Sequence, residues 1–179
     1  MIKYVQGNLL ESDAEALVNT VNEVGIMGKG IALSFKKAFP KNFKNYKKAC
    51  NQGMVHVGYM FTTLNETELA GPKWIINFPT KRHWKDPSML QWIVNGLRDL
   101  VSVIRAHNIR SIAIPALGCG NGKLDWGVVK PEIELAFKDL PDLDVTVYEP
   151  PHKVELFEYK PFTFTWQRPA FMTTDPWSF

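Results

Sequence analysis

Two glycine-rich stretches contain the residues of this sequence that point most directly to chemistry. The first, NEVGIMGKGIAL, has three glycines within residues 25–30, and the second, PALGCGNGKLDW, has three at alternate positions within residues 118–122. Glycine permits positive φ and lets the backbone approach a ligand without an intervening Cβ atom. Free N–H groups in such loops, and the N-terminus of a following helix, bind anions. Two such loops side by side predict a site for a diphosphate.

Neither stretch alone identifies a ligand. GIMGKG lacks the spacing and the Ser/Thr of a P-loop, GCGNG is not GxGxxG, and glycine-rich loops are often ordinary tight turns. A third stretch, NFPTKRHWKD, brings the cations Lys81 and Arg82 with His83 after an apolar run. Three such residues in succession are commonly a solvated loop, so their interpretation depends on where the fold places them.

The elements that would position these stretches follow from apolar periodicity. Leu90, Ile93, Val94, Leu97, Val101 and Ile104 form one apolar stripe of a long helix, for which residues 86–88 predict capping and first-turn positions. Pro40 is expected to end one helix or open the next. The pattern predicts strands at Ile2–Gln6, Ala16–Val21, Tyr59–Thr63, Trp74–Phe78, Ser111–Ile114 and Val145–Tyr148, and helices at Gly30–Ala38, Phe43–Asn51, Ser88–His107 and Gly127–Leu140.

Strands that alternate with helices predict a three-layer α/β domain with a mainly parallel or mixed sheet. In such sheets ligands bind beyond the carboxyl ends of the strands. Both glycine loops and the Lys-Arg-His triplet follow strands, so we expect all three at one edge. We place the domain at residues 1–148. Residues 149–179, with five prolines and eight aromatic residues, are either an ordered arm or the start of a further region.

Composition excludes some classes of protein. No apolar run approaches the ~18 residues that a membrane span needs, and Cys50 and Cys119 form neither a disulfide framework nor a metal-binding spacing. We therefore expect a cytoplasmic protein without a metal, cofactor or membrane partner. The net charge is +3, and KKAFPKNFKNYKK places six lysines within residues 36–48. These lysines are either a solvated helical face or a nucleic-acid surface.

VQGNLLESDAEALVNTVNEVGIMGKGIALSFKKAFP, together with IPALGCGNGKLDW, resembles the macrodomain, an α/β/α module that binds ADP-ribose. Within that family, MGKGIALSFKKAFP and NFPTKRHWKDPS resemble the DarG-type branch. Those proteins are antitoxins that remove ADP-ribose from thymidine in single-stranded DNA and so reverse the partner toxin DarT. The resemblance implies a three-layer α/β/α fold with a central mixed sheet of about six strands.

The resemblance also implies a role for each part of the site. The first loop lines the diphosphate and the proximal ribose, the second forms the other phosphate loop, an early turn holds adenine, and Asn22 faces the distal ribose. Where many macrodomains have Asp, Asn8 accepts a bond from adenine without charge. The implied ligand-binding residues are Gly7, Asn8, Leu9, Asn22, Gly25, Met27, Gly28, Lys29, Gly30, Ile31, Leu117, Gly118, Cys119, Gly120, Asn121 and Gly122.

Lys81 matches the catalytic lysine of the DarG-like branch. Its ammonium would protonate or hydrogen-bond the leaving base, or order a water, and desolvation beside other cations would lower its pKa. A covalent lysine–sugar intermediate is the alternative mechanism. Related lysine-using macrodomains have an Asp where this chain has Gly122, and the nearest carboxylate is Asp125. That departure favours direct hydrolysis.

Three further side chains have competing interpretations. His83 and Trp84 either contact a flipped-out base or, for Trp84, serve packing. Cys119 is either a nucleophile or, as we favour, a small residue between phosphate-binding glycines. No sequence spacing typical of a metal site is present.

The leading interpretation is a hydrolase that releases ADP-ribose from a nucleobase, thymidine in the resemblance, with ADP-ribosylated single-stranded DNA, ADP-ribose and a cognate DarT toxin as partners. The first alternative is an ADP-ribose reader without catalysis. The second is a hydrolase of protein-linked ADP-ribose or of O-acetyl-ADP-ribose. An interaction role for residues 149–179 would supplement the enzyme.

Overall fold

The computed structural model describes residues 1–65 and 71–150. Within these residues, six strands form one sheet in the order β1-β6-β5-β2-β4-β3, with every neighbouring pair parallel except β3 and β4. The predicted three-layer α/β fold with a mixed sheet of six strands is confirmed. The strands are β1 (Ile2–Val5), β2 (Ala16–Asn22), β3 (Phe61–Leu64), β4 (Trp74–Lys81), β5 (Ser111–Pro115) and β6 (Asp144–Tyr148).

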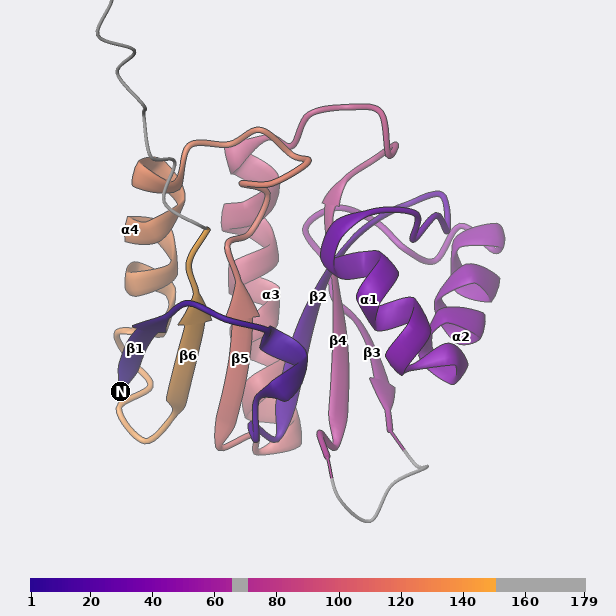
Figure 1. Ribbon diagram of the computed structural model, residues 1–179. Coiled ribbons are helices and arrows are strands. Elements are labelled where there is room, and N and C mark those ends of the chain that lie inside the picture. Colours follow the sequence, from indigo (N-terminus) through magenta and orange to yellow (C-terminus); the bar gives the residue numbers. More distant parts are fainter. Residues whose placement is uncertain (66–70, 151–179) are drawn as a thin grey trace, which may run out of the picture.

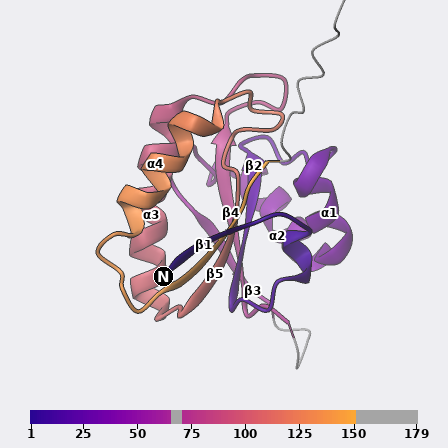
Figure 2. The same ribbon diagram turned by 60° about the vertical axis from the view of Figure 1, so that its left-hand side comes forward.

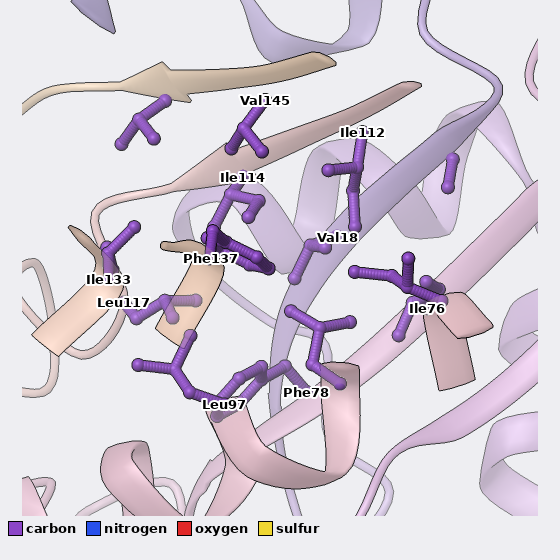
Figure 3. Close-up of a cluster of buried hydrophobic side chains, with 14 of the residues drawn as sticks. Val18, Ile76, Phe78, Leu97, Ile112, Ile114, Leu117, Ile133, Phe137 and Val145 are labelled. Carbon is purple, nitrogen blue, oxygen red and sulfur yellow. The ribbon is translucent and has the colours of Figure 1, made fainter. Parts of the chain in front are cut away.

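Helices cover both faces of the sheet (Figures 1 and 2). One face carries α1 and α2, which pack through Phe35 and Tyr46, and the other carries α3 and α4. The larger core lies between the sheet and α3 and α4, where branched side chains of the strands meet Leu97 and Phe137 (Figure 3). The helices are η1 (Leu9–Glu11), α1 (Gly30–Ala38), α2 (Pro40–Asn51), α3 (Leu90–His107) and α4 (Trp126–Phe137).

Three predicted boundaries differ from the structure in ways that matter for the site. Strand β4 continues past Phe78 to Lys81, because a register shift after Val21 accommodates the end of the strand beyond Pro79. Strand β3 begins at Phe61, so the residues before it form a loop. Helix α3 begins at Leu90, and its N-cap, Met89, makes no side-chain capping bond, so the predicted capping role of residues 86–88 is wrong.

Other predictions hold in detail. Helix α1 has the predicted bounds, and Pro40 stands in the first turn of α2, where its missing N–H costs no helical hydrogen bond. The proposed arm begins at Glu149, which is tied to the body by its N–H bond to Val5 O and by an ion pair with Lys130 at 3.2 Å. The rest of that segment, residues 151–179, lies outside the described residues.

Candidate functional site

The ends of three neighbouring strands bring the predicted stretches together. Because β2, β4 and β5 are parallel, the loops that follow them gather at one edge, uppermost in Figure 1. Asn22 ends β2 directly opposite Lys81, which ends β4. The two glycine loops also meet, since a Cβ atom on Gly30 would lie 3.2 Å from Nδ2 of Asn121. The expectation that both loops and the lysine share this edge is confirmed.

Lys81 lies in a different environment from the solvated loop that its neighbours suggested. It is the last residue of β4, only 7% exposed, and its Nζ donates a hydrogen bond to the backbone oxygen of Asn121 at 2.8 Å. Burial lowers the pKa of Lys81, Lys123 lowers it further, and Asp86 opposes both. The next residue, Arg82, is exposed and packs over the ring of Trp92 at 5.5 Å. The structure thus separates one buried ammonium from the exposed cations beside it.

The first glycine loop is shaped by Asn22. The Asn22 amide donates to Ile26 O at 2.6 Å and accepts from the N–H groups of Val24 and Ile26, while Tyr46 donates to Asn22 O at 2.6 Å. Asn22 was predicted to face the distal ribose, yet its side chain is 5% exposed and bonded within its own loop. In the structure, the Asn22 side chain holds the first glycine loop in place through these hydrogen bonds.

The other residues of the first glycine loop are partly buried against the core and partly exposed. Gly25 has φ +77° and lies against Lys47 and Cys50, and the Met27 side chain is packed inside. Lys29 is the N-cap of α1 but makes no side-chain hydrogen bond to its first turn. Ile31 is half-buried in that turn. An anion at this helix end would therefore meet backbone N–H groups at the exposed residues 28–30.

The second loop is closed underneath and open on top. Leu117 and Gly118 are buried, and Gly118 has φ +73°. A Cβ atom on Gly122 would overlap Gly118 O and the Ser88 hydroxyl, whereas one on Gly120 would have no neighbour within 4 Å. Gly120 and Asn121 are exposed. The open positions are thus those that a ligand could approach.

The buried side of this loop rests on Ser88. The Ser88 N–H donates to Gly122 O at 2.9 Å, and its buried hydroxyl finds no hydrogen-bond partner among the described residues. Because Gly118 O and the Ser88 hydroxyl lie where a Cβ atom of residue 122 would be, this backbone has no room for an Asp side chain at position 122. Asp125, the nearest carboxylate in sequence, accepts from Gly127 N at 2.7 Å as the N-cap of α4. Neither position supplies Lys81 with a carboxylate partner.

The turn expected to hold adenine lies between β1 and η1. Asn8 caps η1 by accepting from Leu10 N, and its Nδ2 donates to Glu11. Gly7 has φ +140° and is exposed, whereas Leu9 is buried in the core. A ligand at this turn would meet Gly7, the Asn8 amide and backbone groups, with Leu9 as packing beneath them.

The remaining candidates separate by exposure. The ring centroids of His83 and Trp84 lie 5.3 Å apart with the rings tilted by 35°, and Trp84 is 48% exposed, with Lys85 over its ring. Cys119 is half-buried, and burial together with Asp125 raises the pKa of its thiol to about 11. The thiol is therefore protonated at neutral pH, which argues against a nucleophile.

No group of three or more His, Cys, Asp or Glu residues within 1–65 and 71–150 could hold a metal ion. In the same part of the chain, no helix is long and apolar enough to cross a membrane.

Sequence reasoning missed two residues that build the site. Tyr46 carries a buried hydroxyl on a helix known from sequence only as lysine-rich, and Ser88 was interpreted as part of a helix start. A buried tyrosine flanked by lysines is a detectable irregularity, but nothing in the sequence assigns its hydroxyl to Asn22.

Comparisons with known proteins agree with this geometry. The Macro domain family model matches residues 18–133. The chain is 55% identical over 150 residues to a DNA ADP-ribosyl glycohydrolase of Mycobacterium tuberculosis and 52% identical over 150 residues to one of Thermus aquaticus. These matches cover 84% of this chain but only 42% and 41% of the relatives, so the chain spans about two fifths of their length.

Solved structures give the same result. The chain superposes on the macrodomain of Mycobacterium tuberculosis DarG with a TM-score of 0.82, covering 84% of this chain and 98% of that one. It superposes on Thermosipho africanus DarTG, solved in complex with ADP-ribose, with a TM-score of 0.79 at 34% identity, covering 84% and 42% of the two chains. A Thermosipho africanus relative, 36% identical over 73% of this chain and 37% of its own length, is a DNA ADP-ribosyl transferase–DNA ADP-ribosyl glycohydrolase fusion protein.

Proposed function

The chain belongs to the macrodomain family, and from that premise we propose that it hydrolyses the bond between ADP-ribose and a thymine base in single-stranded DNA. The activity would reverse a DNA ADP-ribosyltransferase toxin of the DarT type, in the cytoplasm. The observation that carries the proposal is the buried Lys81 ammonium, held at 2.8 Å on the backbone of the second glycine loop. Buried ionisable side chains at the edge of a site are typical of catalytic acids and bases.

The two glycine loops would hold the diphosphate. The open backbone at residues 28–30 and at Gly120 and Asn121 supplies the approachable surface, and Gly7 and Asn8 would receive the adenine end. Because Asn22 and Lys81 are paired across β2 and β4, a ligand that extends from the loops toward these strand ends brings its distal ribose to Lys81. The sugar carbon bonded to the base would then lie at the lysine.

Lys81 would act on the departing base. As water attacks the anomeric carbon and the carbon–nitrogen bond breaks, the bonding electrons leave with the thymine nitrogen. The Lys81 ammonium donates a hydrogen bond or its proton to the base, and the attacking water releases the proton that restores the ammonium. ADP-ribose and unmodified thymidine are the products. Burial suits this role, because a lowered lysine pKa makes the ammonium a stronger acid.

The surface around the lysine suits a DNA strand. Residues 24–65 contain seven lysines and neither Asp nor Glu, and the six lysines of residues 36–48 are all exposed. Beside Lys81 lie the exposed Arg82 and the adjoining rings of His83 and Trp84. Cations that contact phosphates and aromatic rings that stack on bases are the features of single-strand binding sites.

The test uses a single-stranded oligonucleotide that carries one ADP-ribosylated thymidine, incubated with the wild type and with Lys81→Ala. We expect release of ADP-ribose by the wild type alone, and ADP-ribose affinity within a few fold in both. No release by either protein, with tight ADP-ribose binding retained, would favour a reader or a protein-linked substrate. Release by both would remove Lys81 from the mechanism.

A further inference from the structure

A polar groove lies on the α3 side of the molecule, and none of its lining residues belongs to a glycine loop. One wall is the loop before β3, at residues 57–59, and the other is the outer face of α3. Its volume of about 320 Å³ is at the lower end of the ~300–1,000 Å³ usual for ligand pockets. The four α3 residues in it are spaced at i, i+3, i+4 and i+7, which places them on one helix face: Asn95, Arg98, Asp99 and Ser102.

Hydrogen bonds fix both walls. Met60 N–H donates to Asp99 at 2.6 Å, which ties the loop to the helix. Gly58 has φ +89°, and a Cβ atom there would lie 3.2 Å from Asn95 Cβ, so glycine allows the loop to approach α3 closely. At the other end, Val57 N–H donates to the Glu23 carboxylate at 2.7 Å. The groove is therefore a built feature of the fold.

The same bonds connect the groove to the candidate active site. Glu23 follows Asn22 in the chain, and its N–H donates to Arg82 O at 3.1 Å. Arg82 in turn packs over Trp92. Asn95 follows Trp92 by three residues, which corresponds to about 4.5 Å along the helix axis. These contacts join the groove to the end of β4 through Glu23 on one wall and through Arg82 and Trp92 on the other.

The chemistry of the lining is mixed. Tyr59 is 66% exposed, and the residue before it, Gly58, has no side chain that could cover the ring. Arg98 is exposed and offers a guanidinium, which binds phosphate through parallel N–H groups. Asn95 and Ser102 offer amide and hydroxyl groups. Asp99 would repel a phosphate but would accept from an amino or imino group of a base.

We propose that this groove binds a nucleotide that flanks the modified base, with its base on Tyr59 and its phosphate at Arg98. The inference rests on the proposed function, because it supplies a subsite for the DNA strand beyond the ADP-ribosylated nucleotide. These three side chains fit the three parts of one nucleotide: the Tyr59 ring can stack on the base, the Asp99 carboxylate can accept hydrogen bonds from the base, and the Arg98 guanidinium can bind the phosphate.

The test compares two substrates, the ADP-ribosylated thymidine nucleoside and the same nucleoside within a long single strand. Tyr59→Ala and Arg98→Ala are measured against Arg105→Ala, which makes the same charge change two turns further along the same face of α3. Since stacking of one base contributes ~1–3 kcal/mol, we expect each groove variant to lower kcat/KM on the strand about fivefold or more. The nucleoside, ADP-ribose affinity and Arg105→Ala should be unaffected.

Conservative variants separate recognition from folding. Tyr59→Phe keeps a stacking ring and should retain the wild-type rate on the strand, and Arg98→Lys should retain part of it. Equal losses on strand and nucleoside, or no loss on either, would overturn the subsite. A wild type that releases ADP-ribose from neither substrate would overturn the proposed function itself. If the wild type releases ADP-ribose from the nucleoside with the same kcat/KM as from the strand, only the groove proposal would be overturned.

Discussion

Gly120→Glu would test where the ligand binds with little disturbance of the fold. Gly120 is exposed, its φ lies outside the positive range, and an added Cβ would meet no atom within 4 Å. We therefore expect the melting temperature to stay at the wild-type value. In the liganded protein, the new carboxylate would stand in the second phosphate loop, facing the diphosphate.

The magnitude follows from the charges. Two like charges ~4 Å apart repel by about 4 kcal/mol at an effective dielectric constant near 20, which corresponds to almost three orders of magnitude in affinity. Because position 120 is at the surface, solvent and salt screen part of this repulsion, and we expect a loss of about 100-fold. Calorimetric titration with ADP-ribose measures it directly.

Gly120→Gln is the matched control, since it adds nearly the same atoms without the charge. We expect its affinity to lie between those of the wild type and Gly120→Glu, with the difference between Glu and Gln reduced at high salt. Gly120→Glu that binds ADP-ribose within threefold of the wild type would refute the placement of the diphosphate at this loop. A melting temperature lowered in both variants would instead indicate local unfolding.

Three other outcomes are expected. Because Lys81 has a lowered pKa and acts as an ammonium, kcat/KM should fall on the alkaline side at a pH below that at which an ordinary lysine loses its proton, measured as a pH–rate profile. Tyr46→Phe leaves the buried Asn22 carbonyl without its partner, so it should cost about 1–3 kcal/mol of unfolding free energy and weaken ADP-ribose binding several fold, by denaturation and calorimetry. Gly96→Ala would drive a Cβ atom into the buried Phe78 ring and should destabilise the protein by roughly 1–3 kcal/mol in the same denaturation assay.

Apolar periodicity was sufficient to predict the elements and the edge at which the site lies. The stripe of α3 is long and regular, and parallel strands necessarily end at the same side, so the two glycine loops and Lys81 could be brought together from sequence. The end of β4 could not be predicted, because Pro79 normally breaks a strand ladder. Only the register shift opposite it, after Val21, allows the strand to continue as far as the lysine.

Polar contacts within the site were beyond sequence reasoning for a different reason. Asn22 was assigned to the distal ribose because it matches an asparagine of the macrodomain family that has this role. In the folded protein its amide is bonded within the loop, and Tyr46, distant in sequence, supports the same residue. Such bonds depend on three-dimensional closeness between α2 and β2, on which neither propensity nor spacing carries information.

The partner of Lys81 bears on the choice between direct hydrolysis and a covalent intermediate. A lysine that attacks sugar must first lose its proton, and a carboxylate beside it would accept that proton. Here the partner is the Asn121 carbonyl, which only accepts a hydrogen bond, and Gly122 has no space for a carboxylate. Burial lowers the pKa of Lys81, Asp86 opposes this effect and Lys123 adds to it, and an ammonium with a lowered pKa is a stronger acid toward a departing base. The geometry therefore favours an acid at the leaving group and a water as the nucleophile.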